Sequence, residues 1–181
     1  MSYRVACVLI GLGAMASGFD AQAVKSRGEL FQDWRGRLES AAQAQARGDD
    51  DRAIDLYGSI LSEAESRREE AGLLVARAVD GLADVYREQH RFDLAAPLYE
   101  RSVEAWTRLL GASQPRRAVT LHNLGVCYVE LADWAAAERV LREALAVWRD
   151  GGHPAQRIAE TEKVLVAARA RRSIPWNDTP R

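Results

Sequence analysis

A short motif of leucine, a small residue and tyrosine recurs in this chain at a fixed interval. Leu82-Ala83-Asp84-Val85-Tyr86 matches Leu124-Gly125-Val126-Cys127-Tyr128, and the two tyrosines, 86 and 128, lie 42 positions apart. Self-similarity at such a period is typical of repeat proteins, in which one small unit is stacked several times. Three copies are therefore expected, at about 34–75, 76–117 and 118–159. The same interval relates Tyr57 to Tyr99, Ala53 to Ala95 and Ala137, and Trp106 to Trp148.

Each copy carries the pattern of two helices. In the third copy, apolar residues at three- and four-residue steps run from Val119 to Tyr128 and again from Ala136 to Trp148, which is the spacing of amphipathic helices. Polar breaks interrupt the pattern at 48–50, 90–92 and 132–134, where Asp49, Asp93 and Asp133 are expected to cap the second helices or sit in their first turns. The chain is therefore predicted to be all-α, with one helical hairpin per copy.

Outside the repeats, the sequence predicts a lead-in at 24–33, a final helix at 155–172 that covers the open end, and a loose tail at 173–181. Ile158, Val164, Leu165 and Ala168 of the final helix are expected to face inward. The tryptophans that recur at repeat positions are expected in the core, so replacing Trp106 or Trp148 by Ala is predicted to cost roughly 3–5 kcal/mol.

Residues 1–23 read as a secretory signal peptide. Arg4 precedes an apolar run of about a dozen residues, which is shorter than the roughly 20 that a membrane-spanning helix needs. Small residues follow, with cleavage expected after Ala23 or after Ala16. An exported chain in the periplasm or cell envelope is predicted, or a cytoplasmic one if these residues form an N-terminal helix instead. Cleavage would leave Cys127 as the one cysteine, expected as a buried inert thiol, the alternative being an intermolecular disulfide or redox sensor.

These motifs resemble the tetratricopeptide repeat (TPR), in its 42-residue variety similar to kinesin light chains. Leu124, Gly125, Tyr128, Ala137 and Leu141 fit the family pattern, and the second copy fits it as well. The resemblance implies a right-handed α-solenoid of three TPR hairpins plus a capping helix. It also implies that the first helix of each hairpin lines a concave face, the family's usual site for a peptide or partner helix. That lining is expected to include Arg77, Asp80, Gly81, Asp84, Arg87, Glu88, Val119, His122, Asn123, Val126 and Glu130.

Within this lining, an asparagine in the place of Asn123 is implied to bond a peptide backbone, because an amide both donates and accepts. Only one copy carries it, since Gly81 and Glu39 hold the equivalent places. The function predicted is a non-enzymatic protein-interaction module or scaffold. The alternative is a structural protein of the cell envelope that self-associates through the solenoid ends.

Other functional classes find no support in the sequence. The formal net charge of -1 and pI of about 6.3 give no electrostatic case for binding nucleic acid. No catalytic residue, metal ligand or cofactor is predicted, because His90, His122 and His153 lack partners at zinc-binding spacings. No stable membrane span is expected after cleavage, and the partner is expected to be a protein or peptide.

Overall fold

The computed structural model describes residues 27–67, 72–151 and 154–171. These residues form seven α-helices and no strand. The signal peptide and the loose tail predicted at the two ends lie outside the described residues. The helices are α1 (Arg27–Ala46), α2 (Asp50–Ser66), α3 (Leu73–Glu88), α4 (Phe92–Leu110), α5 (Pro115–Glu130), α6 (Trp134–Asp150) and α7 (Ala155–Arg169).

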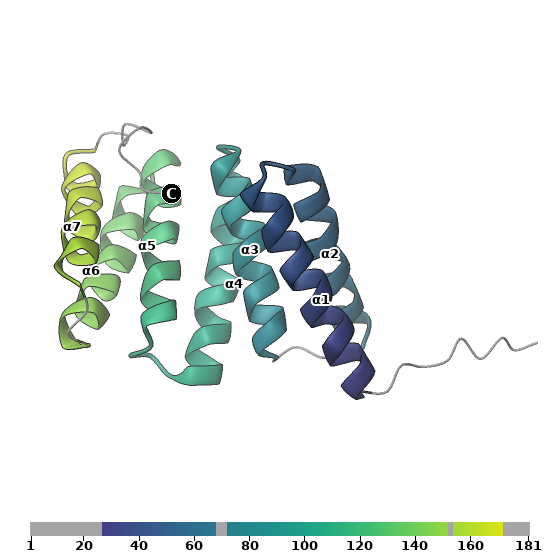
Figure 1. Cartoon of the computed structure of the whole chain (residues 1–181). Coiled ribbons are helices and arrows are strands. Elements are labelled where there is room, and N and C mark those ends of the chain that lie inside the picture. Colours follow the sequence, from purple (N-terminus) through teal and green to yellow (C-terminus); the bar gives the residue numbers. More distant parts are fainter. Residues whose placement is uncertain (1–26, 68–71, 152–153, 172–181) are drawn as a thin grey trace, which may run out of the picture.

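The helices follow one another in a single row, with α1 and α2 at one end and α7 at the other (Figure 1). Each helix packs against its neighbour in the chain, and α1 also contacts α3, as α5 contacts α7. The second helices begin at residues 50, 92 and 134, so the 42-residue interval of the sequence is also the interval of the structure. The prediction of an all-α solenoid of three hairpins closed by a final helix is confirmed.

The turn inside each hairpin uses one residue with a left-handed backbone. Gly48 has a φ of 74°, and His90 and Ala132 each have a φ of 59°. This conformation lets the next backbone N–H return to the end of the first helix, as from Arg91 N to Tyr86 O at 2.8 Å. Only the first of these positions is a glycine, the residue that tolerates this region best.

The predicted cap residues stand at the starts of the second helices. Asp133 caps α6 by accepting a hydrogen bond from Ala136 N at 3.1 Å. Asp49 occupies the same position before α2 without a side-chain bond, and Asp93 lies in the first turn of α4. Between hairpins, Gly111 at a φ of 91° ends α4 and Pro115 begins α5, where a missing N–H costs nothing.

The described interior contains four clusters of buried apolar side chains, which follow one another from α1 to α7. Its close contacts are made by alanines, because a methyl group lets two helix backbones approach. Ala53, Ala95 and Ala137, which share the repeat interval, have no exposed surface. Trp34, Trp106 and Trp148 are buried as predicted, whereas Trp134 is half-buried. In α7, Val164, Leu165 and Ala168 are buried and Ile158 is half-buried, which confirms the inward face of the final helix.

Gly125 marks the tightest approach within the third hairpin. A Cβ atom built there would lie 2.5 Å from both Cγ and Cδ2 of Leu141 on α6. Gly125→Ala is therefore expected to lower the free energy of unfolding by roughly 1–3 kcal/mol, because the core must shift to admit the methyl group. Gly36→Ala is the matched control, since nothing lies within 4 Å of its added Cβ in α1. Urea denaturation should show that the control is stabilised by roughly 0.5–1 kcal/mol. A stabilised Gly125→Ala would contradict the packing described.

Some predicted boundaries need correction. Residues 27–33, expected as a lead-in, are the first turns of α1, and Leu30 among them is only 4% exposed. Helix α1 therefore begins before the first residue of the repeat motif. Its first turns pack against α2 and α3 through apolar residues, and this packing does not require the residues of the motif. At the other end, α7 stops at Arg169 rather than at residue 172.

Candidate functional site

The candidate site is the side of the solenoid formed by the first helices of the hairpins, α1, α3 and α5, together with α7. We call it the first-helix face. Of the residues expected to line it, Arg77 and Glu88 are exposed, and Asp84, Val119, Asn123 and Glu130 are half-buried. The half-buried Asp84 and Asn123 belong to neighbouring hairpins, so the structure brings residues of two repeats together on this face.

Five of the expected lining residues are buried, which corrects the sequence-based picture. Asp80 is 3% exposed, Val126 2%, and Arg87 and His122 9% each, while Gly81 lies against Tyr57. Neighbouring helices cover these positions because α3 and α5 each pack against helices on both sides. These side chains therefore offer little or no surface to a partner. Their polar groups are satisfied inside the protein instead.

Asp80 is the centre of the most extensive of these internal networks. Its carboxylate accepts hydrogen bonds from Ser102 Oγ at 2.5 Å and Trp106 Nε1 at 2.9 Å, both on α4. It also accepts from Arg116 Nε at 3.0 Å and Thr120 Oγ1 at 3.1 Å, both on α5. One carboxylate thus ties together three helices of two adjacent repeats. These four donors were not predicted from the sequence, although Ser102 and Thr120 are polar residues at positions that a helix pair buries.

A second network lies at the edge of the first-helix face. Tyr99 donates to Asp84 Oδ1 at 2.5 Å, and Arg87 Nε donates to the same tyrosine oxygen at 3.1 Å. Asn123 Nδ2 donates to Asp84 Oδ1 at 3.1 Å. Burial raises the pKa of the Asp84 carboxyl, against the opposing effects of the Tyr99 hydrogen bond and the Arg87 charge. The network holds the Asn123 amide in one orientation. The amide oxygen takes no part in the hydrogen bond to Asp84, which is made by Nδ2.

His122 lies at the contact between α5 and α7. Its Nδ1 is 3.0 Å from Thr161 Oγ1, whose own proton is donated to Arg157 O at 2.8 Å. The threonine oxygen is therefore the acceptor and Nδ1 carries the proton. Burial lowers the pKa of His122 from 6.5 to about 4; the Glu160 charge opposes this fall, and Arg157 and Arg87 add to it. At neutral pH the imidazole is uncharged.

The depressed pKa predicts a loss of stability in acid. Between pH 6.5 and 4 the unfolded chain binds a proton at this histidine that the folded chain excludes, so stability falls as the pH falls through this window. From pH 6.5 to pH 4.5 the loss is expected to be on the order of 2 kcal/mol. Urea denaturation at the two pH values measures it. His122→Gln keeps a hydrogen-bonding side chain that does not titrate. Between the two pH values, its loss of stability should be smaller than that of the wild type by on the order of 2 kcal/mol. Equal losses in the two proteins would contradict the prediction.

Cys127 is a structural residue, packed in the core cluster that also contains Leu124 and Trp148. It has no exposed surface, and burial raises the pKa of its thiol to about 12. The nucleophilic thiolate is therefore not populated at neutral pH. The burial agrees with the prediction that Cys127 packs as a small apolar residue.

Within the described ranges, no three His, Cys, Asp or Glu side chains lie together in an arrangement that would bind a metal ion. None of the described helices has the length and apolar character needed to cross a membrane.

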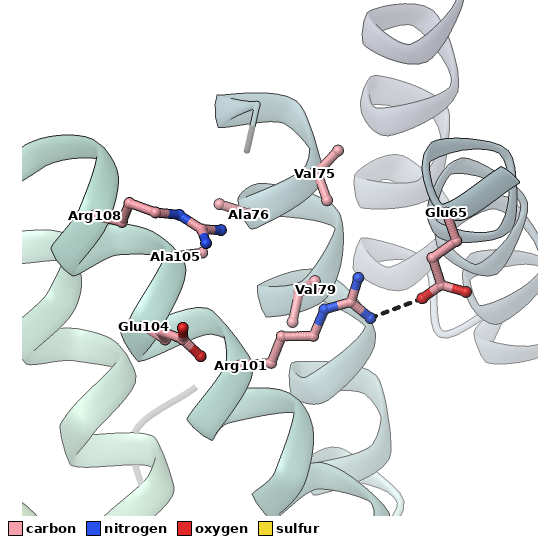
Figure 2. A pocket seen from close by; sticks show the side chains of 8 residues that line it. All are labelled: Glu65, Val75, Ala76, Val79, Arg101, Glu104, Ala105 and Arg108. Atoms are coloured by element: carbon pink, nitrogen blue, oxygen red, sulfur yellow. Dashed lines mark hydrogen bonds and ion pairs between the residues drawn. The ribbon is translucent and has the colours of Figure 1, made fainter. Parts of the chain in front are cut away.

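A hollow of about 420 Å³ lies between α2, α3 and α4 (Figure 2). Val75, Ala76, Val79 and Ala105 form its apolar lining, and Arg101 closes one side with an ion pair to Glu65 at 3.0 Å. Val75 and Val79 lie about half a turn around α3 from Arg77. This hollow is therefore separate from the first-helix face and contains none of the residues predicted to bind a partner.

A search of curated protein sequences returned no match. The crystal structure of BtubC (BKLC) from P. vanneervenii is similar, with a TM-score of 0.74 and 23% sequence identity over 83% of this chain. This chain spans 60% of that protein, and a likeness at this identity concerns the fold. The family model that matches residues 74–150 is described as tetratricopeptide repeat. Residues 74–150, which form the stacked hairpins of α3 to α6, are therefore identified as tetratricopeptide repeats.

Proposed function

We propose that this protein is a non-enzymatic interaction module that binds a peptide or partner helix on the first-helix face. Tetratricopeptide repeats generally mediate protein–protein interaction, and the family match covers α3 to α6. Those helices carry the half-buried and exposed polar residues of the face. The proposed contact residues are those that the structure leaves accessible: Arg77, Asp84, Glu88, Val119, Asn123 and Glu130.

The observation that carries the proposal is the oriented amide of Asn123. Its hydrogen bond to Asp84 at 3.1 Å fixes the side chain across two repeats before any partner arrives. A group that is already ordered loses less conformational entropy on binding than a mobile one. The amide oxygen and the second N–H of Asn123 match the N–H and C=O of an extended peptide backbone. Arg77 and Glu88 offer charges of opposite sign on α3 of the same face.

The experiment is capture of the partner followed by measurement of its affinity. A photoreactive residue at Arg77, which is exposed, is crosslinked in the native compartment and the captured protein is identified. Asn123→Ala is then expected to weaken binding of that protein roughly tenfold, the equivalent of about 1.4 kcal/mol. The matched control is Asp55→Ala, an exposed position on the second helix α2. Capture by a probe at Asp55 but not at Arg77, or an unchanged affinity of Asn123→Ala, would refute the proposed face.

We also propose that the protein acts after export to the periplasm or cell envelope. The support is the apolar run with small residues near Ala16 and Ala23 that the sequence places ahead of the repeats. Mass spectrometry of the protein isolated from its native host tests this. A mature chain that begins at Val24 or Ser17 is expected, and a chain that retains residues 1–16 would contradict export by cleavage.

A further inference from the structure

The two ends of the solenoid each expose one large apolar side chain. Phe31 on α1 is 51% exposed and Val166 on α7 is 55% exposed. They are the two most exposed of the large apolar side chains in the described part of the chain. Because α1 and α7 lie at opposite ends of the row (Figure 1), these side chains belong to opposite ends of the molecule.

The charges at the two ends are opposite in sign. Residues 27–66, the first hairpin, contain nine acidic and five basic residues. Residues 134–171, which cover α6 and α7, contain five acidic and seven basic residues. Two like ends would therefore repel each other, whereas unlike ends attract. Complementarity of this kind favours a head-to-tail contact between two copies over a symmetric one.

The basic end carries a groove beside Val166. It lies between α6 and α7, has a volume of about 560 Å³, and is floored by Leu145, Ala146, Leu165 and Val166. Its rim is formed by three exposed arginines, Arg142, Arg149 and Arg169.

These three guanidinium groups are paired with only two carboxylates. Glu138 binds both Arg142, at 2.6 Å, and Arg169, at 3.0 Å. Glu162 binds Arg149 at 2.6 Å. The rim therefore keeps an excess of positive charge around an apolar floor, and guanidinium groups placed this way attract both carboxylates and the face of an aromatic ring.

We propose that this groove binds the N-terminal end of a second copy of the chain, with Phe31 of that copy on its floor. The phenyl ring covers Val166 and Leu165 and meets the rim guanidiniums, while the acidic hairpin around it neutralises the excess positive charge. The contact joins different surfaces of the two copies, so it leaves one free end of each kind and allows further copies to add. It uses none of the contact residues proposed above, which lie on α3 and α5, so it is independent of the function proposed above.

The test uses two substitutions that remove one apolar anchor each and keep the sign of charge at that end. Phe31→Ser removes the anchor of the acidic end, and Val166→Ser removes the anchor of the basic end, and neither adds a charge that the opposite end would attract. Chains are expressed from the complete sequence, purified with the N-terminus that the host leaves, and studied by sedimentation equilibrium. The wild-type protein is expected to gain mass with concentration beyond that of a dimer. Each variant alone should associate at least roughly tenfold more weakly.

The equimolar mixture of the two variants provides the decisive result. The intact basic end of Phe31→Ser matches the intact acidic end of Val166→Ser, so the mixture should form a complex of two chains that does not grow. Raising the salt from about 0.1 M to about 1 M, where the Debye length falls from ~10 to ~3 Å, should weaken this complex. Circular dichroism and urea denaturation confirm that both variants fold.

Leu131→Glu is the control, because Leu131 is 43% exposed but lies at the turn between α5 and α6. It should associate as the wild type does. The proposal is overturned by a wild-type protein that stays monomeric up to about 1 mM, by either variant dimerising alone as strongly as the wild type, by a mixture that does not associate, or by equal loss of association in Leu131→Glu.

Discussion

Replacing Asp80 by alanine is expected to lower the free energy of unfolding by roughly 3–5 kcal/mol, because the change leaves buried donors without their acceptor. Ser102 and Thr120 are 0% and 1% exposed, and Trp106 is 2% exposed, so water does not replace the lost carboxylate freely. Arg116 also loses its partner, although half of its side chain is exposed.

The measurement is urea denaturation followed by circular dichroism, with Asp55→Ala as the matched control. Asp55 is an exposed aspartate on α2, so its replacement should change stability by less than about 0.5 kcal/mol. Asp80→Ala should also weaken the contact between the second and third repeats, because the carboxylate bridges α3, α4 and α5. Hydrogen exchange is then expected to accelerate at the α4–α5 boundary. A loss of stability no larger than that of the control would show that the Asp80 network is not structural.

Trp106→Ala is the second substitution with a large expected effect, again roughly 3–5 kcal/mol. The indole packs with Ala76 and Ala105 in a core cluster of its own. The Arg116 guanidinium lies over the indole in a cation–π contact, 5.7 Å from the ring centroid. Removing the ring leaves a cavity and takes one donor away from Asp80. Trp134→Ala is the comparison. Because Trp134 is half-buried, its replacement should lower the free energy of unfolding by clearly less than Trp106→Ala does.

The two substitutions are expected not to be additive. Once Asp80 is absent, removing Trp106 no longer deprives the carboxylate of a donor, so the double variant should be more stable than the sum of single losses implies by roughly 0.5–3 kcal/mol. Denaturation of the two single variants and the double variant measures this coupling. Additive losses would mean that the hydrogen bond between Trp106 Nε1 and Asp80 contributes no stability of its own.

Much of the fold follows from the sequence because a repeat array is held together by local contacts. The interval from Tyr86 to Tyr128 is also the interval between the first residues of α4 and α6, at 92 and 134. The small residues Ala95 and Ala137 are buried, as the repeat pattern predicted. The boundary of α1 was misplaced because its first turns carry apolar residues without the repeat motif. Leu30 is one of these, and its burial depends on the neighbouring helices.

The candidate site was predictable only in part. The resemblance to the family and the spacing of the residues predicted that Asp80 and Asn123 both lie on the first-helix face. Spacing along a helix indicates which residues share one face of that helix. Spacing says nothing about which neighbouring helix covers a residue. Asp80 is covered by α4 and α5 and became an internal acceptor, whereas Asn123 stayed half-buried and bonds Asp84 across the repeat boundary.

The sequence by itself determined the helical hairpins, their 42-residue period and the small residues at their close contacts, because these depend on residues near one another in the chain. The tertiary structure alone decided which polar side chains are consumed by internal hydrogen bonds and which remain accessible. It also decided that Phe31 and the Val166 groove lie at opposite ends. The physical reason is that burial and pairing arise between helices, from contacts whose partners lie far apart in the chain, as Asp80 and Thr120 do with a separation of 40 residues.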